Sequence, residues 1–294
     1  MVHRRPARPF LSAVAAGLLL GTLGGCSGAG DDGSAEPTAS RTTGSGTTGS
    51  NPAAASGDTR SDPSPPRSPS PTPSAAATKL DFTPDPSRAP KTRAQALRLA
   101  RSVAAEPVTW GPGFVKRSPY ESDPDAWPVL DKDCVWQLEP VPATVLASLT
   151  RNSELPAEGG KGPIRVTAVV SVHRTVKDAT WEMAGTLEET LRCPEQQLRQ
   201  GERITELASQ GADYGLLGNF ASEDTLTESG KYSSDVLGGP HYYYWVQSRM
   251  AQVTVAVVGK GAEGRSEDEV DAALLQGVGQ MLSSIESELE AAAK

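Results

Sequence analysis

Catalytic and metal-binding signatures are missing from this 294-residue sequence. It contains no G-x-S-x-G, S-x-x-K, H-E-x-x-H or phosphate-binding-loop motif, so it has no recognisable signature of a serine hydrolase, a zinc protease or a P-loop enzyme. Only three histidines and three cysteines are present, and no group of them has the short spacing of a zinc site. We therefore predict no catalytic residue, no metal and no cofactor.

Basic charge and long apolar runs are also scarce. The net charge is −8, and residues 91–294 hold 20 Lys or Arg against 29 Asp or Glu. This balance argues against a nucleic-acid partner, because nucleic-acid-binding proteins present a basic face. No apolar run reaches the roughly 20 residues that a membrane-spanning helix needs.

The first 25 residues have the pattern of a secretory signal peptide. Arg4, Arg5 and Arg8 precede the uncharged run Phe10–Leu23, and small residues follow it. Leu23-Gly24-Gly25-Cys26 resembles the lipobox of bacterial lipoproteins. The resemblance implies a diacylglyceryl thioether on Cys26 and cleavage before that residue. An ordinary signal peptide that happens to contain a cysteine is the alternative, and a twin-arginine signal matches less well.

A lipid on Cys26 would make the membrane a partner of this protein. A single acyl chain binds a bilayer only marginally, whereas two chains anchor a soluble domain stably. The prediction is therefore a protein held at the outer face of the cell membrane.

Residues 26–90 read as a tether between this anchor and a folded domain. Of the 54 residues 27–80, 43 are Gly, Ser, Thr, Pro or Ala, too polar and small to offset the entropy of ordering. Residues 61–73 are proline-rich and favour polyproline II. A proline-rich ligand or a glycosylated stalk is the alternative. The Gly, Pro and Ala content also suggests an actinobacterial source.

Residues 91–294 hold all five tryptophans and all six tyrosines and predict a single α+β domain. Helices are predicted after the N-terminal caps Thr92, Thr175 and Ser266. Their expected buried faces are Ala96, Leu97, Ala100 and Val103 in the first helix; Ala179, Met183, Leu187 and Leu191 in the second; and Val270, Leu274, Val278, Met281, Ile285 and Leu289 in the third.

Strands are predicted between these helices. Residues 163–174 alternate, with Ile164 and Val166 on the apolar face and His173 on the polar face. Residues 241–260 predict a hairpin that turns near 249–251, and 134–140 predict a further strand. Residues 203–207 and 213–220 are weaker candidates. The expected fold is a mostly antiparallel sheet with helices packed on one face.

Cys134 and Cys193 remain as a pair if Cys26 is alkylated. Disulfides persist outside the cytoplasm, so we predict a bridge between them. A catalytic thiol and a metal site are the rival interpretations. The two mature-chain histidines, His173 and His241, are both expected at the surface.

The most suggestive stretch for binding is His241-Tyr242-Tyr243-Tyr244-Trp245. Alternation places Tyr242 and Tyr244 on one face of a strand and Tyr243 and Trp245 on the other, so one pair can face a groove. Tyr243, Trp245 and His241 are the candidate ligand-binding residues. The alternative is that both pairs serve only in packing.

The arrangement from Trp127 onward loosely resembles the extracytoplasmic sensor-like domains of actinobacterial lipoproteins and receptor kinases. The shared features are the lipobox, the tether, the cysteine pair and the late hairpin YWVQSRMAQVTVAVVG before the last helix. The resemblance implies an antiparallel sheet with a cleft and a non-catalytic role in binding an envelope small molecule or protein. An envelope hydrolase with an unrecognised acid/base pair and a purely scaffolding lipoprotein are the alternatives.

Overall fold

The computed structural model describes residues 79–219 and 221–291, so Cys26 and the tether residues up to 78 lie outside the described residues. The elements are α1 (Arg93–Val103), a 3-10 turn η1 (Pro107–Trp110), β1 (Val115–Glu121), β2 (Ala126–Leu130), β3 (Trp136–Pro140), β4 (Val145–Leu155), β5 (Ile164–His173), α2 (Val176–Arg192), β6 (Gln196–Arg199), β7 (Glu202–Asp213), β8 (Asp224–Ser234), β9 (Gly238–Met250), β10 (Val253–Lys260) and α3 (Glu267–Leu289).

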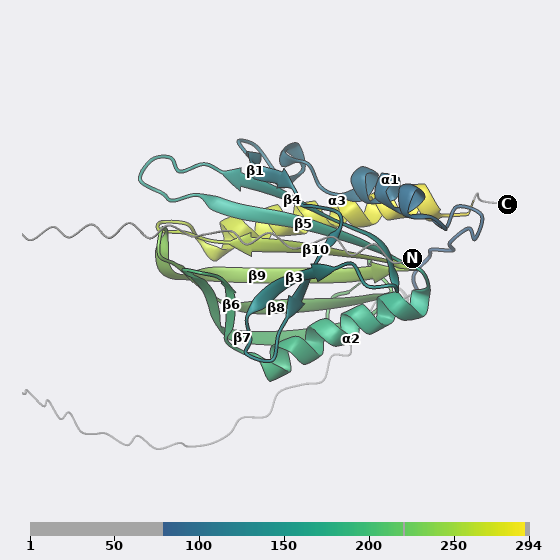
Figure 1. Ribbon diagram of the computed structural model, residues 1–294. Coiled ribbons are helices and arrows are strands. Elements are labelled where there is room, and N and C mark those ends of the chain that lie inside the picture. Colours follow the sequence, from purple (N-terminus) through teal and green to yellow (C-terminus); the bar gives the residue numbers. More distant parts are fainter. Residues whose placement is uncertain (1–78, 220, 292–294) are drawn as a thin grey trace, which may run out of the picture. The chain divides into compact units, whose positions relative to one another are not determined.

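Eight strands form one antiparallel sheet in the order β1-β4-β5-β10-β9-β8-β7-β6 (Figure 1). The predicted hairpin is present as β9 and β10, with Ala251 and Gln252 in the turn. The predicted strand at 134–140 is present as β3, which pairs with β2 in a separate ribbon. The expected class, an antiparallel sheet with helices packed on it, is confirmed.

The main core lies between one face of the sheet and the helices α1 and α3. On β5 the side chains of Ile164, Val166, Ala168, Val170 and Val172 are buried, as the alternation predicted. All six predicted stripe residues of α3 are buried against them. In α1 the buried face contains Leu99, while the predicted Leu97 is only half-buried. The capping boxes at Thr92 and Ser266 are both formed.

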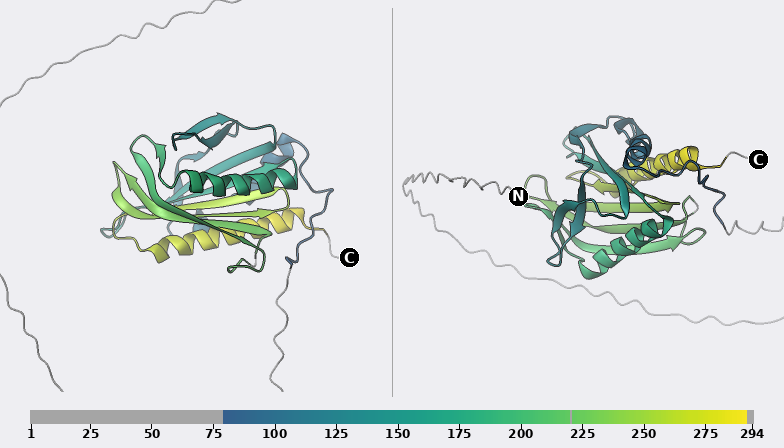
Figure 2. Two further views of the ribbon diagram at one scale, coloured as in Figure 1. Left: turned by 90° about the horizontal axis from the view of Figure 1, so that it is seen from below. Right: turned by 45° about the vertical axis from the view of Figure 1, so that its right-hand side comes forward.

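The helix α2 lies on the other side of the sheet from α1 and α3 (Figure 2). Its Glu182 contacts His173 of β5 and Thr254 of β10, whose side chains point away from the main core. The expectation of helices on one face therefore holds for α1 and α3, and α2 adds a second layer. His173 was expected at the surface, and that expectation is wrong: α2 covers it and leaves it 2% exposed.

Two further predictions need correction. Leu191 was placed on the buried face of α2, but it is 75% exposed, because residues spaced four apart drift around a helix of 3.6 residues per turn and Thr190 takes the buried position instead. Of the weak strand candidate at 213–220, the described residues 214–219 do not form a strand. β7 ends at Asp213, and the chain turns through Gly215 and Gly218, both at a φ of +85°. That left-handed conformation suits glycine and not a strand.

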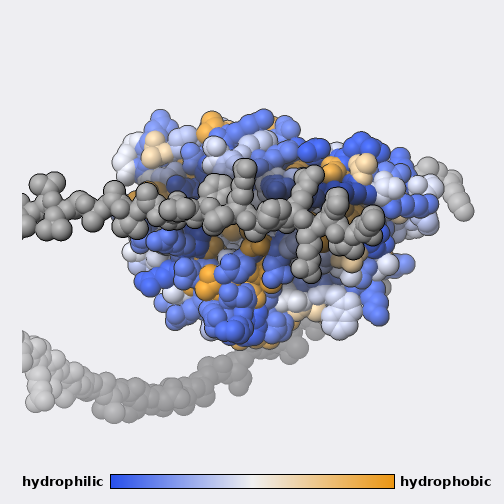
Figure 3. Space-filling model, viewed as in Figure 1, coloured by the Kyte–Doolittle hydropathy of each residue, from blue (hydrophilic) through white to orange (hydrophobic). Residues whose placement is uncertain are grey.

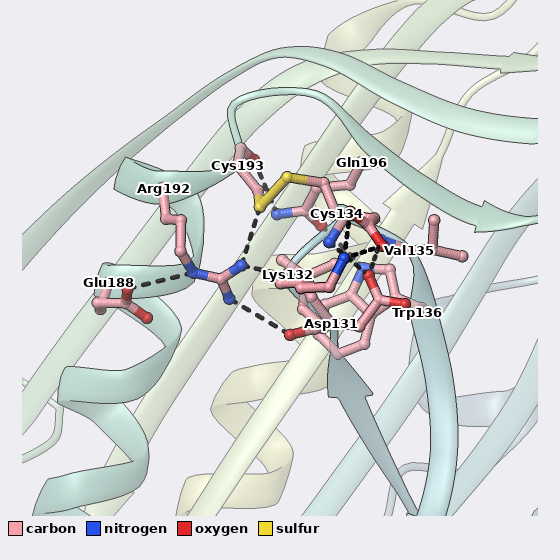
Figure 4. Close-up of a disulfide and its surroundings, with 11 residues drawn as sticks. Asp131, Lys132, Cys134, Val135, Trp136, Glu188, Arg192, Cys193 and Gln196 are labelled. Carbon is pink, nitrogen blue, oxygen red and sulfur yellow. Dashed lines mark hydrogen bonds and ion pairs between the residues drawn. A yellow bond between two sulfur atoms is a disulfide. The ribbon is translucent and has the colours of Figure 1, made fainter.

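The predicted disulfide between Cys134 and Cys193 is present, with an S–S distance of 2.11 Å. It ties the turn between β2 and β3 to the end of α2 (Figure 4). Next to it the Arg192 guanidinium donates hydrogen bonds to the backbone oxygens of Leu130 and Asp131. The ribbon also contacts the sheet edge, where Val135 bridges to Gln197 and the Trp136 indole donates to Gln196.

The tightest contact of the main core predicts a large difference between two glycines of α3. A Cβ at Gly277 would lie 2.1 Å from Cζ3 of the buried Trp110, whereas a Cβ at Gly279 meets nothing within 4 Å. Gly277→Ala should therefore lower the free energy of unfolding by about 1–3 kcal/mol. Gly279→Ala should raise it by about 0.5–1 kcal/mol, because alanine favours the helix. Urea denaturation of both variants checks this, and equal effects would contradict the packing.

Candidate functional site

The face of the sheet that carries α2 is concave. Arg165 on β5 approaches Glu202 on β7, with Nη1 3.8 Å from Oε1. These strands are four positions apart in the sheet, so in a flat sheet they would be separated by about 19 Å. The sheet must therefore curl around this face, as Figure 2 shows.

Six charged side chains from six different strands meet at one end of this concave face. We call them the charged cluster: Arg117, Glu154, Arg165, Arg199, Glu202 and Lys260. Lys260 Nζ lies 3.5 Å from Glu202 Oε2, and Arg199 donates to the same carboxylate. Arg165 Nε lies 3.9 Å from Glu154 Oε2, which is too long for a hydrogen bond.

The charged cluster contains four cations and two carboxylates in a chain whose net charge is −8. Burial lowers the pKa of Lys260 to about 8, and Arg199 and Arg117 add to this while Glu202 opposes it. Burial also lowers the pKa of Arg117, and the charge of Arg165 lowers it further. Burial would raise the pKa of Glu202, but Arg199 and Lys260 outweigh it and hold that pKa below its usual value. The local surplus is therefore positive.

A small apolar cluster forms the floor beneath these charges. It consists of Ile204, Leu207, Tyr232, Tyr243 and Val258, with Trp245 packed against it. Lys260 Nζ lies 4.9 Å from the centre of the Tyr232 ring, a cation–π contact. The floor and the charged cluster thus form one continuous surface of the concave face.

The structure brings together two of the three candidate ligand-binding residues. Tyr243 is buried in the floor, and Trp245 is half-buried beside it. His241 instead binds the Leu237 backbone oxygen through Nε2 at 2.9 Å and lines a separate hollow of about 310 Å³. The predicted alternation is present: Tyr242 and Tyr244 pack on the opposite face, where Tyr242 donates to Asp271 of α3.

Three nitrogen donors on the concave face are buried without an acceptor among the described residues: Trp245 Nε1, Arg117 Nε and Arg165 Nε. They come from β1, β5 and β9, the first, third and fifth strands in the order of the sheet. Thr167 on β5 is two strands from Trp245 in the register of the sheet. The Asn152 side-chain oxygen accepts a hydrogen bond from the Thr167 hydroxyl and another, at 2.9 Å, from Arg117. Arg165 lies two residues before Thr167 on β5, so its side chain is on the same face. Buried donors without partners are rare in folded proteins.

A hollow of about 770 Å³ opens beside the charged cluster. Arg199 and Glu202 form one wall, and the disulfide turn at Cys134 and Val135 forms another. The molecular surface on this side is mostly hydrophilic with small apolar patches (Figure 3). The hollow gives solvent access to the edge of the charged cluster.

The polar groups beneath α2 form a different, closed arrangement. His173 Nε2 lies 2.6 Å from Glu182 Oε2, and the Thr254 hydroxyl donates to the same oxygen. Further along the helix, the Thr190 hydroxyl donates to the buried Glu228 at 2.5 Å. These contacts fasten α2 to the sheet. Within residues 79–219 and 221–291, no three His, Cys, Asp or Glu side chains are grouped to hold a metal.

Sequence reasoning missed the cations of the site. Arg165 and Lys260 each stand at the end of a strongly apolar strand, and both occupy the polar face in the alternation. A cation on the polar face, at one end of an otherwise apolar strand, is a sequence pattern that could have identified these residues as candidates. Their meeting with Glu202 could not be read from the sequence, because the three residues come from β5, β10 and β7.

The comparisons with known proteins assign no family. No family model and no curated protein matches this sequence. The extracellular domain of PknH from Mycobacterium tuberculosis is similar at 11% identity and a TM-score of 0.40, over 63% of this chain and 96% of that domain. CyanoP, the cyanobacterial PsbP from Synechocystis sp. PCC 6803, is similar at 12% identity and a TM-score of 0.23, over 54% and 92%. The first is the extracellular domain of a kinase, and similarities this weak establish neither a shared function nor a site.

The carboxylates under α2 predict a stability that depends on pH. Burial raises the pKa of Glu228 to about 7, although the Thr190 hydrogen bond partly opposes this. Between about pH 4.5 and 7 the unfolded state loses this proton while the folded state keeps it, so the free energy of unfolding falls as pH rises. The full pKa shift of Glu228 corresponds to about 3 kcal/mol of the free energy of unfolding. Burial raises the pKa of Glu189 to about 7 as well, which adds to the same slope.

Glu228→Gln should therefore raise stability at pH 8 relative to the wild type and have little effect at pH 4. Urea denaturation of the full chain across this range measures the slope. Glu288→Gln, on the exposed side of α3, is the control and should leave the slope unchanged. A wild-type slope that survives in Glu228→Gln would show that Glu228 is ionised in the folded protein at neutral pH.

Proposed function

We propose that this chain is a lipid-anchored extracytoplasmic protein whose folded domain binds a ligand on its concave face and does not catalyse a reaction. The observation that carries the proposal is the set of buried, unpartnered donors at Trp245, Arg117 and Arg165, of which Arg165 contacts Glu202 in the lining of an open hollow. An unpartnered buried donor costs about 1–3 kcal/mol. A ligand that accepts hydrogen bonds there removes this cost.

The extracytoplasmic location is supported by two independent features. The Cys134–Cys193 disulfide suits an oxidising compartment. The signal-like residues 1–25 and the lipobox-like sequence before Cys26 supply an export and anchoring route. No helix of the described part of the chain has both the length and the apolar content needed to cross a membrane.

The alternative of an envelope hydrolase has less support. A hydrolase needs an acid/base pair that substrate can reach. The buried carboxylate Glu228 and the His173–Glu182 pair lie under α2. The carboxylates that line the open hollow are Asp133, Glu195, Glu202 and Asp235, and Glu202 is paired with Arg199 and Lys260. A purely scaffolding role gives no reason for buried donors next to a hollow of about 770 Å³.

The anchor predicts a specific effect of one substitution. Cys26→Ala should abolish incorporation of a metabolic palmitate label and move the protein from the membrane fraction to the soluble fraction. Ser27→Ala, at the neighbouring position, is the matched control and should keep both. Label that still enters Cys26→Ala would rule out this cysteine as the lipidation site.

The ligand site predicts position-dependent cross-linking in intact cells. A photoreactive amino acid at Gln197, which lines the hollow, should form an adduct of defined mass. The same amino acid at Gln280, exposed on α3, should not form it. Trp245→Ala should reduce the Gln197 adduct without loss of folded protein, as measured by thermal unfolding. Equal adducts at both positions, or no effect of Trp245→Ala, would count against a concave-face site.

A further inference from the structure

The charged cluster is not balanced as a structural ion-pair network would be. Four cations share two carboxylates, and Arg165, Arg199 and Lys260 all contact Glu202. Positive charges held close together in a partly buried site repel one another, and each disfavours the charged form of its neighbour. The six side chains are therefore incomplete as a set, and one or two negative charges would balance them.

Arg165 is the least satisfied member of the charged cluster. Its closest charged contacts are 3.9 Å to Glu154 and 3.8 Å to Glu202. Its guanidinium donates no hydrogen bond to any residue within 79–219 or 221–291, although its side chain is only 21% exposed. A guanidinium in this state presents a planar fork of donors, the geometry that binds carboxylate and phosphate oxygens in pairs.

Neighbouring side chains add further hydrogen-bond donors and positive charge to the guanidinium of Arg165. Lys260 stands directly opposite Arg165 on β10. Arg117 is held nearby by its hydrogen bond to Asn152, which leaves its Nε free. The Trp245 indole on β9, two strands from β5, provides a further N–H from the floor. These groups offer only donors and positive charge, so they select for a ligand that accepts hydrogen bonds and carries negative charge.

We infer that the charged cluster binds an oxyanion group, a phosphate or a carboxylate, of the ligand, with Arg165 at the centre of the contact and Lys260, Arg117 and the Trp245 indole around it. This inference rests on the proposed binding function and names the chemical class that the site takes. The hollow beside Arg199 and Glu202 leaves room for the rest of the ligand molecule.

The lowered pKa of Lys260 agrees with this geometry. Its value of about 8 reflects burial and the nearby Arg199 and Arg117, against Glu202. A bound oxyanion would add a second negative charge and raise the pKa of Lys260. Binding should accordingly be accompanied by proton uptake near pH 8.

The experiment uses the full chain in detergent, labelled with ¹⁵N-tryptophan and titrated with sodium phosphate or sodium acetate against sodium chloride of equal ionic strength. Of the five indole N–H signals, the one lost in Trp245→Phe should shift saturably with at least one of the two anions and not with chloride. A larger effect of phosphate than of acetate identifies a phosphate-type ligand, and the reverse a carboxylate-type ligand.

Variants then test the contact itself. Arg165→Gln should weaken binding of the effective anion about tenfold or more, as expected for lost charged hydrogen bonds. Lys260→Gln should weaken it several-fold and remove the proton uptake near pH 8, and it serves as the second variant if Arg165→Gln does not fold. Lys231→Gln, on the opposite face of β8, is the control and should bind like the wild type.

Two results would overturn the inference: an indole signal that responds no more to phosphate or acetate than to chloride, or an equal loss of binding in Lys231→Gln. The test of anion binding and the test of the proposed function can give different answers. If the Gln197 adduct forms and depends on Trp245 while neither anion binds, the concave face is a binding site for a ligand of a different class. If anions bind and no adduct forms, the oxyanion site stands and the cellular ligand role fails.

Discussion

The pairing of β5 with β10 in the middle of the sheet is the constraint on which the rest of the structure depends. Every second residue of both strands points into the core beneath α1 and α3, and this burial of apolar surface provides most of the stabilisation. The remaining residues are thereby fixed on the concave face. His173 and Thr254 stand at one end, where they hold α2, and Arg165 and Lys260 stand at the other, where they form the charged cluster.

The concave face is divided between a closed half and an open half. Under α2 the polar side chains contact one another: His173 and Thr254 both meet Glu182, and Thr190 meets Glu228. Beyond the helix the charges outnumber their partners, and donors on Arg117, Arg165 and Trp245 are unused among the described residues. The same polar face thus fastens α2 where the helix covers it, and among the described residues it leaves donors without partners beyond the helix.

Local signals in the sequence were enough for much of the fold. The caps at Thr92, Thr175 and Ser266 set the helix starts, and alternation identified β5 and the β9–β10 hairpin. The missed features are non-local. The burial of His173 depends on which face α2 covers, and the approach of Arg165 to Glu202 depends on the curl of the sheet. Tyr243 and Trp245 could be named as candidates because consecutive aromatics in a strand must occupy both faces, but only the folded sheet shows what each face packs against.

The disulfide has a consequence for when the site is assembled. The turn that Cys134 anchors forms a wall of the hollow, and beyond the covalent link few contacts hold the β2–β3 ribbon to the sheet, among them the Val135 bridge to Gln197 and the Trp136 bond to Gln196. Cytoplasmic thiols stay reduced, whereas exported ones are oxidised. On the proposed route, the precursor would therefore leave the ribosome without the covalent link of this wall, and oxidation outside the cytoplasm would add it. Oxidative folding would then act as a timing step that confines ligand capture to the compartment where the ligand resides.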